Sequence, residues 1–414
     1  MHAAATHVAR RGSRRKQEWG ESSISFGAPP LQDKYMTWIK KVIKNIAALL
    51  IGIILSFFIL EGILRIYNPF EYRVKGDNIV LPANKKYVIK RENDRKLISK
   101  FDDTIIHTKN SLGFRGEEPP VDFKNNLTII TVGGSTTECT FLSDGKTWTD
   151  LLGIKIKKDI KNVWINNAGF DGHSTFGHRI LMEDYIIKLK PDIVLFLVGA
   201  NDLGYNISEK DQEFMRNRFI FSSLKSFLKS MANHSEVFSL GLNMYRYYKA
   251  KKIGVEHQEL DFETFRNGDI NSYLTEDVKK IQKETINDYK NKNLKGFEKR
   301  LKGIVEISKN NNIIPVLITQ PALYGDFVDD VTNIDFKFTR FIWELLELYN
   351  DTTRKVGIEE NILVIDLARE MPKSTRYYYD WLHFSNEGAE KVAEIIYNNV
   401  YPYLTGEYSK QLTM

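Results

Sequence analysis

The stretch "LTIITVGGSTTECT", residues 127–140, joins an apolar run to a glycine-rich turn. Its first part, "LTIITV" (127–132), has the uninterrupted apolar character of a strand that is buried on both faces. Ser135 and Glu138 form the Ser-x-x-Glu pattern of a capping box, which starts helices. A glycine-rich turn after a strand can also cradle a phosphate or present a nucleophile. The stretch alone leaves these roles of Ser135 open.

Similar apolar runs recur along the chain and alternate with helical patterns, for example in 174–190 and 336–357. Strands that are apolar on both faces belong to parallel sheets covered by helices. The alternation therefore predicts a doubly wound α/β domain with a five-stranded parallel sheet. The predicted strands are 127–132, 162–169, 192–199, 312–320 and 361–367.

One connection is much longer than the others. About 110 residues, 203–312, separate the third predicted strand from the fourth, where a handful is usual. This segment holds basic amphipathic pieces such as "FMRNRFIFSSLKSFLKSM" (214–231). We expect a helical insertion that packs on the core. A cap over the active site and a surface that rests on the membrane are the alternatives.

Glycines or polar side chains follow four of the predicted strands. In open α/β sheets, ligands bind beyond the carboxyl ends of the strands, so these turns are expected to meet at one edge. The four groups are Gly133-Gly134-Ser135, Asn166-Asn167-Ala168-Gly169, Gly199-Ala200-Asn201-Asp202, and Asp380 with His383 before the last helix.

The chemistry of these residues is coherent as an acyl-transfer site. A serine hydroxyl is a weak nucleophile and needs an adjacent base, which His383 supplies if Asp380 fixes its tautomer. The tetrahedral intermediate needs donors where its negative charge develops. The Ser135 N–H, the Gly169 N–H and the Asn201 side-chain amide are the candidates for this oxyanion hole. Read singly, Asn201 also suits an Asx turn.

Four blocks carry a resemblance to a known family: "GGSTT" around Ser135, "NNAG" ending in Gly169, "GAND" containing Asn201, and "DWLH" with Asp380 and His383. In this order and spacing, the region from about 125 to 402 resembles the SGNH (GDSL-type) hydrolases. The resemblance implies a flavodoxin-like three-layer α/β/α fold and ester hydrolysis.

By carry-over from the family, Ser135, His383 and Asp380 are the catalytic triad. Ser135, Gly169 and Asn201 then line the oxyanion hole. One departure is that the family's Gly-Asp-Ser is Gly-Gly-Ser here, with Gly134 in place of the aspartate. Upstream, "NSLGFRG" is similar to the lead-in segments of membrane-anchored bacterial members.

Other kinds of site are disfavoured, and we expect no cofactor and no metal. "GGST" lacks the lysine and the spacing of a phosphate-binding P-loop, and it fails the Gly-x-Ser-x-Gly pattern of an α/β-hydrolase elbow. Asp171, His173 and His178 lack a further ligand at a suitable spacing for a metal. The single cysteine, Cys139, excludes an internal disulfide and is expected to be buried rather than reactive.

The charge of the chain is concentrated at its start. The formal net charge of the 414 residues is +6, and residues 1–45, with nine Lys/Arg against three Asp/Glu, account for all of it. The remainder is neutral on balance, which argues against a nucleic-acid partner. Residues 46–66 are almost uncharged and long enough to span a bilayer, and a buried core helix is the alternative.

The positive-inside rule places residues 1–45 in the cytoplasm and the catalytic region outside it, on a single-pass anchor in the cytoplasmic membrane. The expected organisation is listed in order: a basic, partly disordered tail, 1–45; the anchor, 46–66; a tether and lead-in, 67–124; an SGNH hydrolase domain, 125–405, with the insertion at about 203–312; and a C-terminal tail, 406–414.

Three functions are compatible with this organisation. The leading hypothesis is a membrane-anchored serine esterase that hydrolyses O-acyl, first of all O-acetyl, esters on a cell-envelope or extracellular glycan or on small esters. The second is an O-acyltransferase that uses the same triad on a polysaccharide. The third is a non-catalytic envelope-binding protein with the same fold. The sequence does not separate hydrolase from transferase, because both share the acyl-enzyme step. It also leaves the acyl chain and the oligomeric state open.

Overall fold

The computed structural model describes residues 31–70, 74–76, 78–90, 102–203, 224–253 and 293–408. The chain divides into two compact units, Met1–Gly62 and Ile63–Met414. The long helix α1, Leu31–Ile66, begins well before the predicted anchor at residue 46. Within it, Lys34–Ile66 is long and apolar enough to cross a membrane. The first thirty residues of the predicted cytoplasmic tail lie outside the described part.

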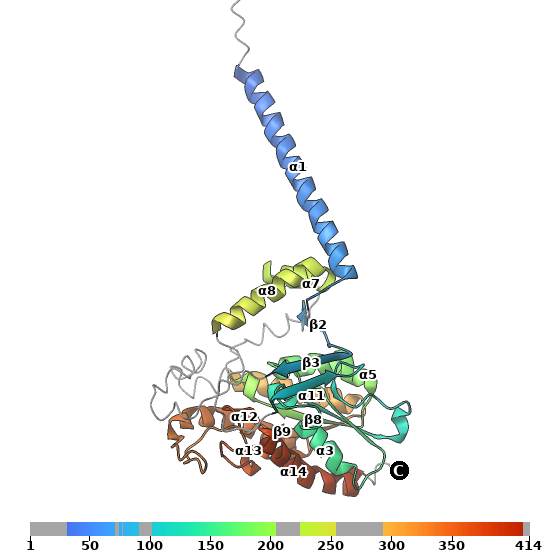
Figure 1. The fold of residues 1–414 in the computed structure, drawn as a ribbon, viewed down its shortest axis with the longest axis vertical. Coiled ribbons are helices and arrows are strands. Elements are labelled where there is room, and N and C mark those ends of the chain that lie inside the picture. The colour runs from blue at the N-terminus through green and yellow to red at the C-terminus, as the bar shows by residue number, and fades with distance from the viewer. Residues whose placement is uncertain are drawn as a thin grey trace, which may run out of the picture. The chain divides into compact units, whose positions relative to one another are not determined.

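A six-stranded sheet forms the centre of the second unit, where Figure 1 labels β8 and β9 among the surrounding helices. Its strand order is β10-β9-β8-β6-β7-β5. Its five parallel strands coincide with the five predicted from the sequence, and their order is the 2-1-3-4-5 order of flavodoxin-like folds. The predicted fold is therefore confirmed, with one addition: β5 pairs antiparallel to β7 at the edge. The strands are β5 (Arg115–Gly116), β6 (Leu127–Gly133), β7 (Val163–Asn167), β8 (Ile193–Val198), β9 (Ile314–Thr319) and β10 (Val364–Ile365).

Helices cover both faces of this sheet, so alternate strand residues enter two separate cores. On β6, Ile129 packs in the core with α3 and α14, whereas Ile130 packs in the core with α4, α11 and α12. The sheet is thus buried on both faces, which explains why its strands are apolar throughout. The helices are α2 (Ser135–Glu138), α3 (Trp148–Ile156), α4 (Thr175–Leu181), α5 (Ile187–Leu189), α11 (Lys295–Asn310), α12 (Arg340–Glu359), α13 (Leu367–Glu370) and α14 (Asn386–Tyr403).

Short turns join or extend these helices. The predicted helix at 174–190 is found as α4, a π-helical turn and α5 in succession, and the one at 336–357 as a 3-10 turn followed by α12. The turns are η1 (Phe123–Asn125), η2 (Met182–Ile186), η3 (Ala200–Asp202), η7 (Lys337–Thr339) and η8 (Leu404–Tyr408).

The lead-in segment forms small strands of its own before it joins the central sheet through β5. β3 and β4 pair antiparallel along their full length, and β1 and β2 form a second two-stranded ribbon. Since β5 belongs to the central sheet, the lead-in is built into the catalytic domain rather than being only a tether. The strands are β1 (Val74–Lys75), β2 (Asn78–Ile79), β3 (Lys85–Lys90) and β4 (Thr104–Lys109).

The described part of the long connection between β8 and β9 consists mainly of helices. α7 (Leu224–His234) and α8 (Glu236–Ile253) pack on each other. α11 belongs to the α/β core, because its apolar face, including Phe297, Leu301 and Ile304, packs with β8. The rest of the predicted insertion, 204–223 and 254–292, lies outside the described residues.

Candidate active site

Ser135 lies at the carboxyl end of β6, as the first residue of the short helix α2. The N-cap of α2 is Gly134, and no side chain caps it. The Ser135 hydroxyl contacts His383 instead, and the Glu138 carboxylate binds Lys109. The capping-box interpretation of Ser135 and Glu138 is therefore wrong, because both side chains are engaged with distant parts of the chain.

The two glycines before Ser135 allow close approach to neighbouring groups. A Cβ at Gly133 would lie 2.1 Å from the Thr137 Oγ1, and a Cβ at Gly134 would lie 2.3 Å from the Asn201 Nδ2. Neither position has room for a side chain unless these groups move. The approach of the Asn201 amide thus gives a physical reason for Gly134 at the position where the family pattern has aspartate.

The predicted triad residues form one chain of hydrogen bonds. The His383 Nε2 lies 2.7 Å from the Ser135 Oγ, and the His383 Nδ1 lies 2.6 Å from the Asp380 Oδ2. The Tyr379 ring stacks on the imidazole with centroids 5.4 Å apart, which restricts how the His383 ring can turn. Ser135 comes from the end of β6, whereas Asp380 and His383 come from the loop before α14, so the fold brings them together from distant parts of the sequence.

The environment of Asp380 keeps it ionised and fixes the tautomer of His383. Burial by itself raises the pKa of the Asp380 carboxyl. The charge of His383 and the hydrogen bonds from His383 and Leu382 outweigh this effect and hold the pKa below its ordinary value. A carboxylate only accepts hydrogen bonds, so the His383 Nδ1 carries the proton and the Nε2 accepts from the Ser135 hydroxyl. This is the arrangement in which histidine acts as a general base on serine.

The loop that carries Asp380 and His383 is held in place by the buried carboxylate of Asp329. This carboxylate accepts hydrogen bonds from the N–H and hydroxyl of Thr375, both at 2.7 Å, and from the N–H and hydroxyl of Thr332. Burial raises the pKa of Asp329, but these four hydrogen bonds outweigh it, and the pKa is lowered overall. Asp329 thus joins two loops on the carboxyl side of the sheet.

Replacement of Asp329 by asparagine is expected to lower the free energy of unfolding by about 2–3 kcal/mol at pH 7, because the amide cannot accept all four hydrogen bonds. A carboxyl with a lowered folded pKa contributes stability above its unfolded pKa of about 3.9, and loses it as the pH falls through the folded value. The difference in Tm between wild type and Asp329→Asn should therefore be largest above about pH 5 and shrink below about pH 4. Equal Tm values at pH 7 would contradict this role.

The structure contradicts one predicted oxyanion-hole donor. The Gly169 N–H donates to the Asn167 Oδ1 at 2.8 Å, and Gly169 is buried. A Cβ at this position would lie 2.3 Å from the Glu138 N, so Gly169 serves the packing of the turn against α2. Its N–H is occupied and is not available to a substrate.

The turn that follows offers a better donor. The Phe170 N–H donates to the Gly133 O, the Asp171 N–H to the Glu138 Oε2 and the His173 N–H to the Phe170 O. The Gly172 N–H is the one in this turn that makes no hydrogen bond with the described residues. Gly172 is exposed, and its φ of +74° is one that favours glycine.

The other two predicted donors belong to Ser135 itself and to Asn201. The Ser135 N–H makes no hydrogen bond within the described part of the chain, as expected for the first turn of a helix. The Asn201 Nδ2 donates one hydrogen to the His173 O at 2.9 Å, which leaves its second hydrogen for another acceptor. The same carbonyl lies near Gly134, so the turn that holds Gly172 borders the residue before Ser135.

Asp202, next to Asn201, stabilises the turn after β8. Its fully buried carboxylate accepts from the Thr175 N–H and hydroxyl and pairs with Arg300 of α11 at 3.0 Å. The turn after β8 is thereby tied to the starts of α4 and α11.

The single cysteine lies at the end of α2 and is buried. Burial raises the pKa of the Cys139 thiol to about 12, so the thiol stays protonated and unreactive. Within the described residues, no group of three His, Cys, Asp or Glu side chains is arranged to hold a metal ion.

Sequence reasoning missed Gly172 and the contribution of the lead-in. The signal for Gly172 was a second glycine three residues after Gly169, in a polar turn where a positive φ is common. In the lead-in, Arg115 donates to the main-chain oxygens of Glu138, Cys139 and Leu142, and so holds the loop after α2.

The comparison with protein families gives a match over most of the domain. A model of the GDSL-like Lipase/Acylhydrolase family matches residues 130–391. This match contains Ser135, Gly172, Asn201, Asp380 and His383. No curated protein matches the chain.

Solved structures similar to the chain include three esterases. The acetylxylan esterase Axe2 from Geobacillus stearothermophilus is 14% identical over 66% of this chain and 93% of its own, with a TM-score of 0.38. The acetyl xylan esterase AlAXEase is 16% identical over 66% of this chain and 99% of its own, with a TM-score of 0.38. The psychrotrophic esterase EstA from Pseudoalteromonas sp. is 13% identical over 68% of this chain and 100% of its own, with a TM-score of 0.38.

Proposed function

Because the chain belongs to the GDSL-like lipase/acylhydrolase family and is a hydrolase of ester bonds, we propose that it is a membrane-anchored serine esterase. Its substrates are O-acyl esters, first of all O-acetyl esters on a cell-envelope or extracellular glycan. The observation that carries the proposal is the hydrogen-bond chain from Ser135 through His383 to Asp380, with distances of 2.7 and 2.6 Å.

In the proposed mechanism, the Ser135 Oγ attacks the carbonyl carbon of the ester while the His383 Nε2 takes its proton. The oxyanion accepts hydrogen bonds from the Ser135 N–H, the Gly172 N–H and the Asn201 amide. The intermediate collapses to an acyl-serine, and the alcohol leaves with the proton from His383. A water molecule, activated by His383, then cleaves the acyl-serine. Asp380 stabilises the imidazolium in both halves of the reaction.

The proposed location rests on α1 and on the charge next to it. Lys34–Ile66 is long enough to cross a membrane, and the excess of Lys and Arg precedes residue 46. These two features support a catalytic domain outside the cytoplasm, on the cytoplasmic membrane. A catalytic domain held there would reach acylated polymers of the envelope, which motivates the proposed glycan substrate.

One experiment tests the nucleophile and the location together. A membrane-impermeant fluorophosphonate added to intact spheroplasts is expected to label Ser135, identified by mass spectrometry of the modified peptide. Labelling only after lysis would contradict the location, and labelling of another residue would contradict the nucleophile. Product analysis on an acetylated glycan should give free acetate. Acetyl transfer to a second sugar would favour the acyltransferase.

Replacement of Asn201 by alanine is expected to lower kcat for p-nitrophenyl acetate about 100-fold with little change in KM, because the amide would contact the oxyanion but not the ground-state ester. Asn311→Ala is the control, since the Asn311 amide donates to the Ile307 O in α11, away from the site. The proposal for Asn201 fails if both variants keep the same kcat.

A further inference from the structure

A buried ion pair involves Glu138, three residues after the proposed nucleophile Ser135. The Lys109 Nζ of β4 lies 2.9 Å from the Glu138 Oε1 at the end of α2, and each side chain is only 2% exposed. Burying two charges is costly unless further hydrogen bonds satisfy them. The second carboxylate oxygen of Glu138 accepts the Asp171 N–H at 2.6 Å. The pair is thus connected to the turn that holds Gly172.

Further charged groups surround this pair. Arg115 donates to the Glu138 O and pairs with Asp144 at 3.0 Å. The His107 Nε2 lies 4.0 Å from the Glu138 Oε1. Burial and the charges of Arg115 and Lys109 lower the pKa of His107 to about 3, so the imidazole is neutral at pH 7. Two cations, Lys109 and Arg115, therefore face the carboxylates of Glu138 and Asp144.

We propose that the Glu138 carboxylate, whose charge Lys109 balances, positions the oxyanion hole. Lys109 holds the Glu138 carboxylate, which fixes the Asp171 N–H, and the next N–H along the chain is that of Gly172. The neighbouring N–H groups of Phe170 and His173 are also bound, so the peptide of Gly172 is held on both sides with its own N–H left for the substrate. The inference rests on the proposed function, since it assigns a role within the same site.

Lys109 lies outside the part of the chain that matches the family model, which begins at residue 130. Glu138 lies inside it, three residues after Ser135. The lead-in segment thus supplies the cation that balances the charge of the positioning residue Glu138. The connection is short: β4 leads through residues 110–114 to β5, whose residues pair with Asn166 and Asn167 at the end of β7.

Two double variants separate the effect of the hydrogen bond between the Asp171 N–H and Glu138 from the effect of the charges on Lys109 and Glu138. Lys109→Met/Glu138→Gln removes both charges and keeps an acceptor for the Asp171 N–H. Lys109→Met/Glu138→Leu removes both charges and that acceptor. With full-length protein and p-nitrophenyl acetate, the glutamine variant should stay within about threefold of wild type in kcat. The leucine variant should lose about 10- to 100-fold in kcat, with KM within about twofold, because a misplaced oxyanion donor weakens only the transition state.

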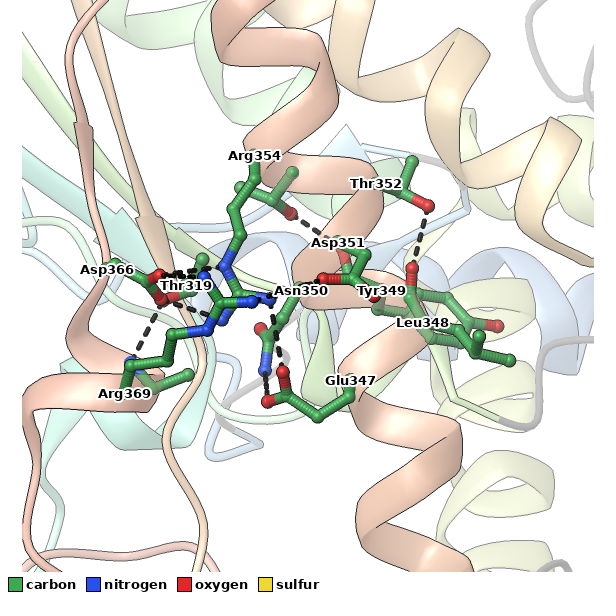
Figure 2. Close-up of polar contacts among 12 residues, drawn as sticks. Thr319, Glu347, Leu348, Tyr349, Asn350, Asp351, Thr352, Arg354, Asp366 and Arg369 are labelled. Atoms are coloured by element: carbon green, nitrogen blue, oxygen red, sulfur yellow. Dashed lines mark hydrogen bonds and ion pairs between the residues drawn. The ribbon is translucent and has the colours of Figure 1, made fainter.

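The matched control is an ion pair next to β10, at the opposite edge of the sheet from β5. Arg354 of α12 binds Asp366 at 2.7 Å and also contacts Glu347 and Asp351, as Figure 2 shows. Arg354→Met should lower Tm but leave kcat unchanged. All rates are divided by the concentration of sites that a fluorophosphonate titrates, so that loss of folded protein does not count as loss of kcat.

The outcomes separate the inference from the proposed function. If wild type hydrolyses the ester and the two double variants have equal kcat, the positioning role of Glu138 is wrong while the esterase proposal stands. If wild type neither hydrolyses the ester nor reacts with the fluorophosphonate, the proposed function fails, and the inference fails with it. A low kcat in the leucine variant alone, with normal KM, supports the inference.

Discussion

Replacement of Ser135 by alanine is expected to lower kcat/KM for p-nitrophenyl acetate by about 10⁵- to 10⁶-fold. The Ser135 Oγ is the atom that would form the acyl-enzyme, and its partner, the His383 Nε2, lies 2.7 Å away. Without the Ser135 hydroxyl, only the oxyanion donors and the binding of the ester contribute to catalysis, and these give a small residual rate. The measurement is the initial rate of p-nitrophenol release by purified full-length protein.

Two controls make this result specific. Ser308→Ala removes another buried serine hydroxyl, one that donates to the Ile304 O within α11, and it should keep full activity. The double variant Ser135→Ala/His383→Ala should be no slower than Ser135→Ala alone, because residues that act as a unit do not contribute additively. A Ser135→Ala protein that keeps more than a few per cent of the activity would rule out Ser135 as the nucleophile.

The strands could be predicted because their signals are local, and the ends of those strands grouped the three candidate triad residues. Each parallel strand is apolar throughout, and the polar turns follow from where each strand ends. The partner of Ser135 lies 248 residues away, so the stretch around Ser135 could not show that its hydroxyl binds His383 instead of capping α2. The grouping of strand ends and the resemblance of the four blocks to a known family indicated this contact.

The expectation for the Gly169 N–H was wrong, because sequence does not show which N–H groups are already occupied. Gly169 and Gly172 both follow β7, but the Asn167 side chain takes the N–H of Gly169 and not that of Gly172. The lead-in was harder still. β5 contains two residues, too few for a periodic pattern, and Lys109 and Glu138 lie 29 residues apart with no spacing rule to join them. Such contacts depend on tertiary structure alone.

Replacement of Asp380 by asparagine is expected to lower kcat about 10⁴-fold with little change in KM, through the tautomer of His383. The Asp380 Oδ1 accepts the N–H groups of Leu382 and His383 at 2.8 and 2.7 Å. In the variant, these two donors would hold the amide oxygen, so the amide NH₂ would face the His383 Nδ1. The Nδ1 would then have to accept, and the proton would move to the Nε2, which could no longer take the proton of Ser135.

The tautomer itself can be measured. The ¹⁵N shifts of the His383 ring should show a protonated Nδ1 in wild type and a protonated Nε2 in Asp380→Asn at a pH where the ring is neutral. Asp335→Asn is the control, since Asp335 also accepts a main-chain N–H, that of Lys337, but lies exposed on another loop. If Asp380→Asn keeps kcat within tenfold of wild type while its ring shifts match those of wild type, Asp380 does not set the tautomer. The loop fixes the two N–H groups that donate to the Oδ1 of residue 380. Unchanged ring shifts would therefore mean that the asparagine NH₂, rather than its oxygen, faces these two N–H groups.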